Sequence, residues 1–309
     1  MTTHLLIAGA SGFVGSRVAA EARRRPDVRV RLLSRQAPPG PEYVRGDLAV
    51  PPSLRGACAG IDVLVHCASR IGGDVSAAEA VNDRGTRALV EEAVRAGVRR
   101  IVYVSTAAVH GRGPFRGVRP GEAPVAPVSA TSRTRAAAER HVLDAGGLVL
   151  RPHLVYGEGD RWVIPGLVWL MEELSATLTG CDARQSMIDV TALARAVVAA
   201  ALSPRYAGGV RHVNHPEPVP VTDLLGRVCA EVAAPCPGAR VDVPTALERA
   251  AGSPRALHHL GMLTVDHWFA DDAFWTGVDC PPGEGFAAGF ARAAPWYRSY
   301  LGNRTARTP

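Results

Sequence analysis

The sequence predicts an α/β fold in which a doubly wound parallel sheet is joined to a smaller, partly interleaved domain. Short apolar runs alternate with longer amphipathic stretches over the first 150 residues. Strands that are buried on both faces of a parallel sheet read as such unbroken apolar runs. A glycine-rich turn at Gly9–Gly15 joins the first run to the first helical stretch. After Arg151 the alternation weakens, so we expect one domain over residues 1–160 and a second mainly over 161–309.

The expected elements of the first domain follow from the apolar runs and from the residues that interrupt them. Pro26 ends the first helix and Gly97 the second, because proline and glycine punctuate regular structure. The expected strands are His4–Ala8, Val28–Leu33, Asp62–Ala68, Arg100–Ser105 and Leu148–Leu150, and the expected helices are Gly12–Arg25, Val75–Ala96 and Ser132–Ala145.

The rest of the chain predicts a mainly helical domain that is interleaved with the first. We expect a strand and a helix near residues 185–215 to return to the first domain. Residues 110–130 are too rich in glycine and proline for regular structure, and connections of this length are often functional. The expected helices are Val163–Leu178, Thr191–Leu202, Thr222–Ala233 and Phe286–Leu301, and the expected strands are Gln185–Val190 and Gly209–His215.

All 35 basic side chains are arginine, and the formal net charge is +6. Biased codon usage explains this better than a demand for arginine chemistry. The absence of lysine excludes Schiff-base catalysis by lysine and a phosphate-binding P-loop lysine. The charge is dispersed, with no basic tail or aromatic-studded stripe, so we expect no nucleic-acid partner.

The sequence predicts a cytoplasmic protein without a membrane or metal partner. It opens without a basic signal-peptide region, and no run of about 18 apolar residues could span a bilayer. The cysteines are scattered without a Cys-x-x-Cys pair, which favours free thiols over zinc ligands or disulfides. They are Cys58, Cys67, Cys181, Cys229, Cys236 and Cys280.

The turn after the first strand predicts a dinucleotide site. Gly9 permits a tight turn, Gly12 lets the backbone approach a pyrophosphate, and Gly15 lets the helix pack against the strand. The helix N-terminus then faces the phosphates. The residues expected to form this cradle are Gly9, Ser11, Gly12, Phe13, Val14 and Gly15.

The second strand ends in Ser34-Arg35, where an acidic side chain would hold the ribose 2′-hydroxyl of NAD. A hydroxyl and a guanidinium suit a 2′-phosphate instead, so the sequence favours NADP(H). The alternative is that Arg35 is an ordinary surface residue. Asp47-Leu48 follows a strand-like Tyr43-Val44, and Asp47 either accepts from the adenine amino group or caps a helix.

Together these residues make the chain resemble the extended short-chain dehydrogenase/reductases, also called the NAD-dependent epimerase/dehydratase family. The resemblance implies a Rossmann domain, a nicotinamide cofactor and hydride transfer between the cofactor and a carbonyl or alcohol. It also implies cofactor contacts by Leu48, Cys67, Ala68, Ser69, Pro152 and His153. Besides the glycine turn and Asp47-Leu48, it rests on Val65–Ser69, Val81–Thr86, Val104–Gly111, Arg151–Gly157 and Ile188–Val190.

The family normally uses a serine or threonine, a tyrosine and a lysine, and this chain departs from that pattern. The hydroxyl position falls on Thr106, but Thr131 stands for the tyrosine and Arg135 for the lysine. Neither threonine nor arginine is a useful proton donor near neutrality. Arg135 can still bind ribose hydroxyls or phosphate. Among the six tyrosines, only Tyr156 is expected near the cofactor, and the resemblance favours a structural role for it.

We therefore expect an NADPH-dependent ketoreductase of antibiotic biosynthesis that acts on an aromatic polyketide ketone, as atypical angucyclinone ketoreductases do. Thr106 and Thr131 would orient the carbonyl, and a neighbouring phenol of the substrate or water would supply the proton. His110 and His153 are less favoured proton relays. The five tryptophans suit either an aromatic ligand or the core: Trp162, Trp169, Trp268, Trp275 and Trp296.

Two alternatives remain, and the oligomeric state is not predicted. One is a non-catalytic NADP(H)-sensing or scaffold protein, since intact cofactor motifs without an acid would look the same. The other is a sugar-nucleotide epimerase or reductase, which is weakened because reversible oxidation needs a base at the tyrosine position.

Overall fold

The computed structural model describes residues 2–206, 208–232 and 236–305. Seven parallel strands form the main sheet in the order β12-β7-β5-β4-β1-β2-β3. Their apolar runs are almost wholly buried, as a sheet covered on both faces requires. The strands are β1 Thr3–Ala8, β2 Val28–Ser34, β3 Tyr43–Arg45, β4 Val63–His66, β5 Arg100–Val104, β7 Leu148–Arg151 and β12 Gly209–His212.

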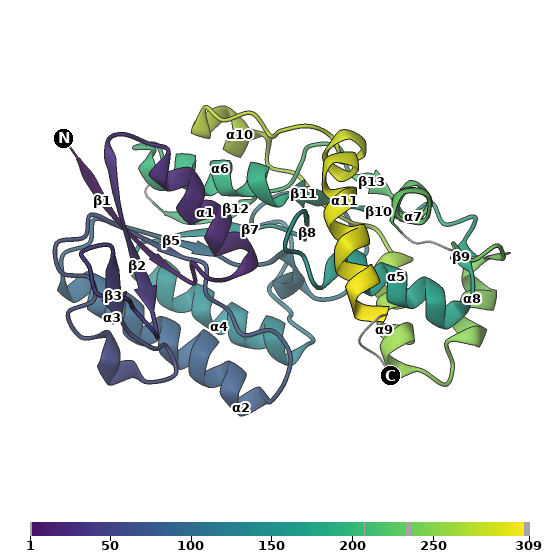
Figure 1. Cartoon of the computed structure of the whole chain (residues 1–309), viewed down its shortest axis with the longest axis horizontal. Coiled ribbons are helices and arrows are strands. Elements are labelled where there is room, and N and C mark those ends of the chain that lie inside the picture. Colours follow the sequence, from purple (N-terminus) through teal and green to yellow (C-terminus); the bar gives the residue numbers. More distant parts are fainter. Residues whose placement is uncertain (1, 207, 233–235, 306–309) are drawn as a thin grey trace.

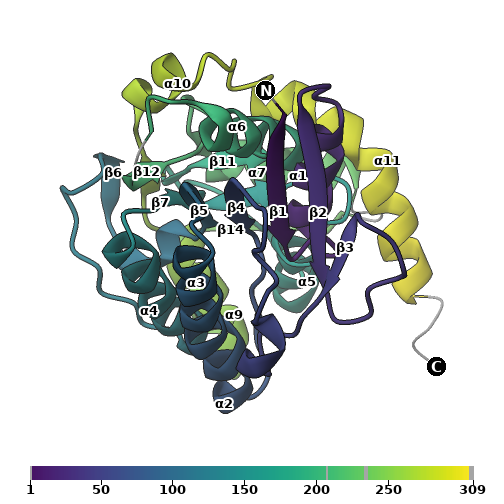
Figure 2. The ribbon, with the colours of Figure 1, turned by 90° about the vertical axis from the view of Figure 1, so that its left-hand side faces the viewer.

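Helices cover both faces of this sheet, which confirms the doubly wound α/β class (Figures 1 and 2). On one face α1 (Phe13–Arg23) packs against α6 (Val190–Leu202), and α10 (Asp272–Val278) lies beside α6. On the other face lie α2 (Val75–Ala78), α3 (Thr86–Arg95) and α4 (Ala130–Asp144). Each face has its own apolar core.

The remaining helices surround a third core, which contains Leu170, Leu224, Leu260 and Phe290. A small mixed sheet, in the order β13-β10-β15-β6, lies beside them. The helices are α5 Val163–Leu174, α7 Val221–Glu231, α8 Val243–Arg249, α9 Pro254–Leu263 and α11 Phe286–Thr305. The strands are β6 Phe115–Val118, β10 Arg184–Gln185, β13 Val219–Pro220 and β15 His267–Phe269, with the pairs β8–β11 (Leu154–Tyr156, Met187–Asp189) and β9–β14 (Thr177–Leu178, Arg240–Val241).

The chain passes more than once between the main-sheet region and the region around the third core, so the two regions are not two consecutive stretches of sequence. Strand β12 pairs with β7 and helix α6 packs on α1, as expected for the 185–215 stretch. The expected strand over 185–190 is instead two short strands, β10 and β11, and neither joins the main sheet. Among the described residues, no helix is long and apolar enough to cross a membrane.

Several expected boundaries are wrong. The segment after residue 110 is not irregular throughout, because β6 pairs with β15. The long helix over 75–96 is divided by a π-helical stretch, Glu79–Gly85, where Gly85 packs against the backbone of Leu48. Helix α5 ends at Leu174 because Ser175 takes a left-handed conformation with φ of 48°. Of the helix expected over 222–233, Ala233 lies outside the described residues.

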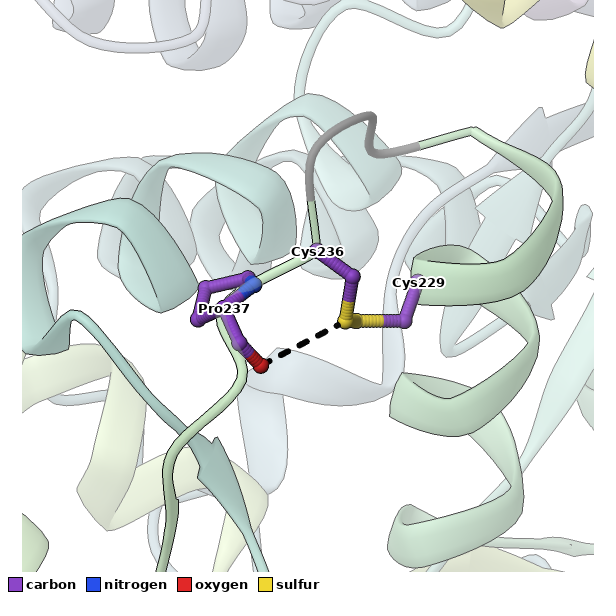
Figure 3. The surroundings of a disulfide bond; sticks show 3 residues. All are labelled: Cys229, Cys236 and Pro237. Carbon is purple, nitrogen blue, oxygen red and sulfur yellow. Dashed lines mark hydrogen bonds between the residues drawn. A yellow bond between two sulfur atoms is a disulfide. The ribbon is translucent and has the colours of Figure 1, made fainter.

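The expectation that all six cysteines are free is also wrong. Cys229, in the last turn of α7, is bonded to Cys236 in the following segment (Figure 3). Helix α7 ends only two residues after Cys229, so the chain can turn back and bring the Cα atoms within 5.1 Å. The spacing of seven residues matches no motif, so the sequence carried no signal for the pairing. Cys58, Cys67, Cys181 and Cys280 are free.

Candidate functional site

The candidate site lies where the strand order of the main sheet reverses. The chain turns outward from β1 in one direction, to β2 and β3, and from β4 in the other, to β5 and β7. Ligands of open α/β sheets bind at the carboxyl ends of the strands at this switch point. The segments that leave β1, β4 and β5 here are Gly9–Gly15, Cys67–Ser69 and Ser105–Thr106. The topology therefore brings the predicted cofactor and catalytic residues to one edge.

The Gly9–Gly15 turn forms a cradle that side chains would fill. Gly9 has a φ of 87°, and a Cβ there would lie 2.5 Å from the backbone nitrogen of Ala68. A Cβ on Gly15 would collide with the carbonyl oxygen of Gly9, so α1 packs this closely on β1 only with glycine. Gly12 precedes α1 and offers no side-chain cap. The first N–H groups of the helix are thus available to a phosphate.

The other residues of the cradle differ in exposure. Ser11 and Gly12 are exposed, whereas Phe13 and Val14 are half-buried. The ring of Phe13 lies against Gly159, in the loop that follows β8.

At the expected adenosine end, Arg35 is exposed directly after β2. Ser34 is half-buried, and its hydroxyl accepts from the Gln36 N–H over 3.3 Å. Asp47 does not cap a helix; its carboxylate accepts from the Ala49 N–H over 2.9 Å and forms a tight turn. Leu48 is buried against Gly85. The adenine contact of Asp47 stays a prediction.

At the expected nicotinamide end, buried polar atoms lack protein partners among the described residues. They are Ser69 Oγ after β4, Ser105 Oγ after β5, and Arg135 Nε on α4. Buried groups of this kind normally have a hydrogen-bond partner. These hydroxyls and the guanidinium fit the ribose and carboxamide of a nicotinamide nucleotide, and the cradle fits its pyrophosphate. The residues present therefore suit a nicotinamide dinucleotide.

Arg135 is held at the end of β5. Its Nη2 donates to the Val104 carbonyl oxygen over 2.6 Å, and its Cζ lies 5.9 Å from the ring centroid of Tyr103. Burial, assisted by the Arg135 charge, lowers the pKa of His66 to about 3. Burial also raises the pKa of the Cys67 thiol to about 12 against the opposing effect of Arg135. Neither neighbour exchanges protons near neutrality.

Thr106 and Thr131 present hydroxyl groups on two neighbouring elements. Thr106 Oγ1 accepts from the Ala108 N–H over 3.2 Å and caps the 3₁₀ helix Ala107–His110. Thr131 lies in the first turn of α4, one turn before Arg135, and its Oγ1 accepts from the Gly72 N–H over 3.4 Å. In both contacts the hydroxyl accepts, so its own hydrogen can be donated to a carbonyl oxygen.

No tyrosine takes the place left at residue 131. Tyr156 is buried between Phe286 and Phe290, and burial raises its pKa. Tyr103, beneath Arg135, is fully buried, and burial raises its pKa as well. The others lie in elements away from Thr131 or are engaged by other groups: Tyr43 in β3, Tyr206 on carbonyls of α10, Tyr297 on Asp160, and Tyr300 against Trp296.

The motif histidines are also engaged elsewhere. His153 Nε2 contacts Gln185 over 3.1 Å, and its backbone N–H donates to Asn214. The Pro152 carbonyl accepts from the Ala107 N–H. Because the Pro152 carbonyl and the His153 N–H are occupied, the His153 carbonyl is the backbone group of this pair that could bind the carboxamide of the cofactor. Burial lowers the pKa of His153 to about 3 and lowers that of His110.

The tryptophans do not gather around the site. Trp162 is exposed at the start of α5, and Trp169 lies under the guanidinium of Arg255. Trp268 covers Gly117, Trp275 donates to the Asn214 carbonyl, and Trp296 stacks on Tyr300.

With the site's geometry in place, a family model provides the decisive match: residues 5–214 fit the NAD dependent epimerase/dehydratase family. The chain belongs to that family. Its curated relatives include the 2-alkyl-3-oxoalkanoate reductase of Stenotrophomonas maltophilia, which is 29% identical over 303 residues, 86% of this chain and 91% of the relative. The sterol-4-alpha-carboxylate 3-dehydrogenase of Saccharomyces cerevisiae is 30% identical over 53% of this chain and 54% of its own.

Solved structures share the fold over nearly the whole chain. WbmH of Bordetella bronchiseptica, in complex with NAD+, has a TM-score of 0.76 at 19% identity and covers 97% of this chain and 99% of its own. UDP-glucuronic acid 4-epimerase of Bacillus cereus, in complex with NAD, has a TM-score of 0.74 at 16% identity, with 96% and 97% covered. The family thus gives this chain a nicotinamide cofactor of the NAD(P) type, while its relatives differ in substrate.

Two residues that position the site were not recognised from the sequence as doing so. The buried side chain of Asn82 exchanges hydrogen bonds with the backbone of Arg70 and donates to Thr134 Oγ1, so it ties the loop after β4 to α4. Ser105 lies beside Thr106 with its hydroxyl enclosed. Both lie in motifs named above; the tertiary contacts show what Asn82 holds, whereas the Ser105 hydroxyl has no partner among the described residues.

The Gly15 close approach is testable by substitution. Gly15→Ala should lower the free energy of unfolding by about 1–3 kcal/mol and abolish nucleotide binding, because the new methyl group collides with the Gly9 carbonyl. Gly226→Ala in α7, where a Cβ meets nothing within 4 Å, should raise stability by about 0.5–1 kcal/mol. Urea denaturation and cofactor fluorescence titration measure both effects. Equal behaviour of the two variants would contradict the account.

Proposed function

We propose that this protein is an NADPH-dependent ketoreductase that acts on an apolar, aromatic polyketide ketone whose own phenol supplies the proton. The observation that carries the proposal is the start of α4, where Thr131 and Arg135 occupy the tyrosine and lysine positions expected from the sequence. Arg135 holds its guanidinium at the carboxyl end of β5, Thr131 holds its hydroxyl beside the loop after β4, and neither residue offers a phenol.

The chain's own residues account for binding and orientation. Thr106 and Thr131 donate their hydroxyl hydrogens to the ketone oxygen and hold it in one position. Arg135, fixed on the Val104 carbonyl, binds the nicotinamide ribose with its remaining nitrogens. The cofactor, when bound, supplies the hydride that converts the ketone carbon into the alcohol carbon.

The proton on the product oxygen must come from outside the usual set of residues. A positioned general acid contributes roughly 10²- to 10⁴-fold, so its loss slows reduction without forbidding it. An aryl ketone with an adjacent phenol holds that hydrogen against its carbonyl oxygen before reaction. As the carbonyl electron pair moves to oxygen, the phenol O–H bond breaks, the alcohol O–H bond forms, and water later reprotonates the phenolate.

Exposed apolar side chains near Thr131 support an apolar substrate over a sugar nucleotide. Ile71 precedes Gly72, which contacts Thr131, and Val75 begins α2, which packs on α4. Val125 and Val128 lie in the segment that leads into α4. All four side chains are about half exposed. The 2-alkyl-3-oxoalkanoate reductase also acts, by its name, on a ketone of an alkyl compound.

The preference for NADP(H) rests on Arg35 at the end of β2. Arg35→Ala should weaken NADPH binding about tenfold to a hundredfold and leave NADH binding unchanged, because only NADPH carries the 2′-phosphate. Arg29→Ala, an exposed arginine at the other end of the same strand, is the matched control and should change neither constant. Calorimetric dissociation constants measure this, and an unchanged NADPH to NADH ratio in Arg35→Ala would refute the assignment.

Turnover separates the candidate functions. NADPH consumption is expected with a hydroxylated polycyclic aryl ketone, and none with a UDP-sugar. The double variant Thr131→Tyr/Arg135→Lys should gain less than about threefold on the hydroxylated ketone, because the substrate already brings its acid. Arg140→Lys, an exposed position of the same helix, is the control.

Three results would contradict the proposal. Tight NADPH binding without turnover across a panel of ketones would favour a sensing or scaffold protein. UDP-sugar turnover would favour an epimerase. A gain of about a hundredfold or more in the double variant would indicate that the acid is merely missing.

A further inference from the structure

Three buried imidazoles surround the segment 111–128, which connects the two threonines of the candidate site. His110 ends the 3₁₀ helix after Thr106, His212 ends β12, and His267 begins β15. Each is at most 2% exposed. None is used by the reaction proposed above. Because histidine is seldom fully buried, the burial of all three needs an explanation.

Each ring holds the backbone of the segment at a different point. The N–H of Gly113 donates to His267 Nε2 over 3.2 Å. His212 Nδ1 donates to the Val118 carbonyl over 3.1 Å, and His110 Nδ1 donates to the Pro124 carbonyl over 2.9 Å. The three contacts are spread over most of the segment's length, and they come from three elements that are distant in the sequence.

The contacts of His267 and His110 require uncharged rings of defined tautomer. His267 donates from Nδ1 to the Val265 carbonyl over 3.0 Å, which leaves Nε2 to accept from Gly113. His110 donates from Nδ1 and accepts at Nε2 from Arg151 Nη1 over 3.2 Å. Only a neutral imidazole offers one donor and one acceptor in this way. Burial lowers the pKa of all three rings, which favours their neutral forms.

Aromatic packing joins the three rings into one cluster. His110 stacks on Phe269 at 5.5 Å between centroids, and His212 lies 4.9 Å from the same ring. Phe115, which the segment itself contributes through β6, packs on His267 at 5.5 Å. His212 Nε2 and His110 Nε2 are 3.1 Å apart. The segment is therefore held both by its backbone and by its most buried side chain.

The segment determines where parts of the candidate site lie. It begins at Gly111, immediately after the 3₁₀ helix that Thr106 caps, and it leads to Ser129, the N-cap of α4. It carries Val125 and Val128, and between them Ala126 pairs with the Val109 carbonyl. Displacing it would move the apolar side chains next to Thr131.

We propose that His110, His212 and His267 are positioning residues that hold the segment 111–128 as one wall of the ketone-binding site. The proposal rests on the function proposed above for its substrate, whereas the backbone contacts can be tested without any substrate.

Amide hydrogen exchange of the full chain with NADPH present tests the wall directly. His212→Phe and His267→Phe keep a ring of similar size but remove the nitrogen that binds the backbone. Both should speed exchange in the segment about tenfold, Gly113 included, while amides of β1, β4 and β5 stay within about twofold. His259→Phe, the same substitution in α9, should leave the segment unchanged. His110 is avoided because its loss would also remove a partner of the buried Arg151.

Kinetics separate positioning from simple stabilisation. Both Phe variants should raise KM for the hydroxylated ketone about tenfold, with kcat and the NADPH dissociation constant within about threefold of wild type. His267→Gln, which retains an acceptor for Gly113, should restore KM. Unchanged exchange in both Phe variants would overturn the proposal, as would faster exchange with unchanged KM. If neither the wild type nor any variant reduces a ketone, the proposed function fails. The exchange data would still decide whether the histidines hold the segment.

Discussion

A buried ion pair between α4 and β7 fixes the helix that carries the two residues on which the proposed chemistry depends. Arg151 donates to both carboxylate oxygens of Glu139, over 2.9 and 2.5 Å, and both side chains are almost fully buried. Breaking such a pair by removing one partner typically costs about 3–5 kcal/mol, because a buried charge is left alone. The pair therefore keeps α4 seated on the sheet, whatever side chains its first turn carries.

The consequences of this seating extend along α4 in both directions. Arg135 lies one turn before Glu139 and reaches the end of β5, and Thr131 lies a further turn away, beside the loop after β4. On its other side Arg151 donates to His110, which holds the long segment before α4. The helix thus holds the two positions where the family has tyrosine and lysine, but threonine and arginine occupy them and the phenol is absent. This arrangement favours a chemistry in which the protein orients and the substrate supplies the acid.

Local patterns predicted the cofactor half of the molecule well. Features that depend on neighbours in the sequence can be predicted from the sequence alone. They are the apolar runs of β1, β2, β4 and β5 and the turn at Gly9–Gly15. The resemblance aligned Thr131 and Arg135 with the tyrosine and lysine positions of the family, and in the structure Arg135 contacts Val104 at the end of β5 and Thr131 contacts Gly72 in the loop after β4.

The remaining features depend on contacts between distant residues. Strand β6 exists because β15, about 150 residues later, pairs with it, and the histidine cluster draws on three separate elements. Short helices such as α8 and α10 lack the length for a clear period. The disulfide between Cys229 and Cys236 could be predicted only after the end of α7 was known. In each case the partner, rather than the local sequence, determines the structure.

If the substrate supplies the proton, removing its phenol hydrogen must slow the reduction. The rate of hydride transfer in a single turnover at saturating NADPH would be measured for a hydroxylated aryl ketone and for its methyl ether, which differ in the phenol hydrogen. The account predicts a rate about 10²- to 10⁴-fold lower for the ether, with similar binding of both compounds. Equal rates would contradict it, because a donor on the protein or from water would then suffice.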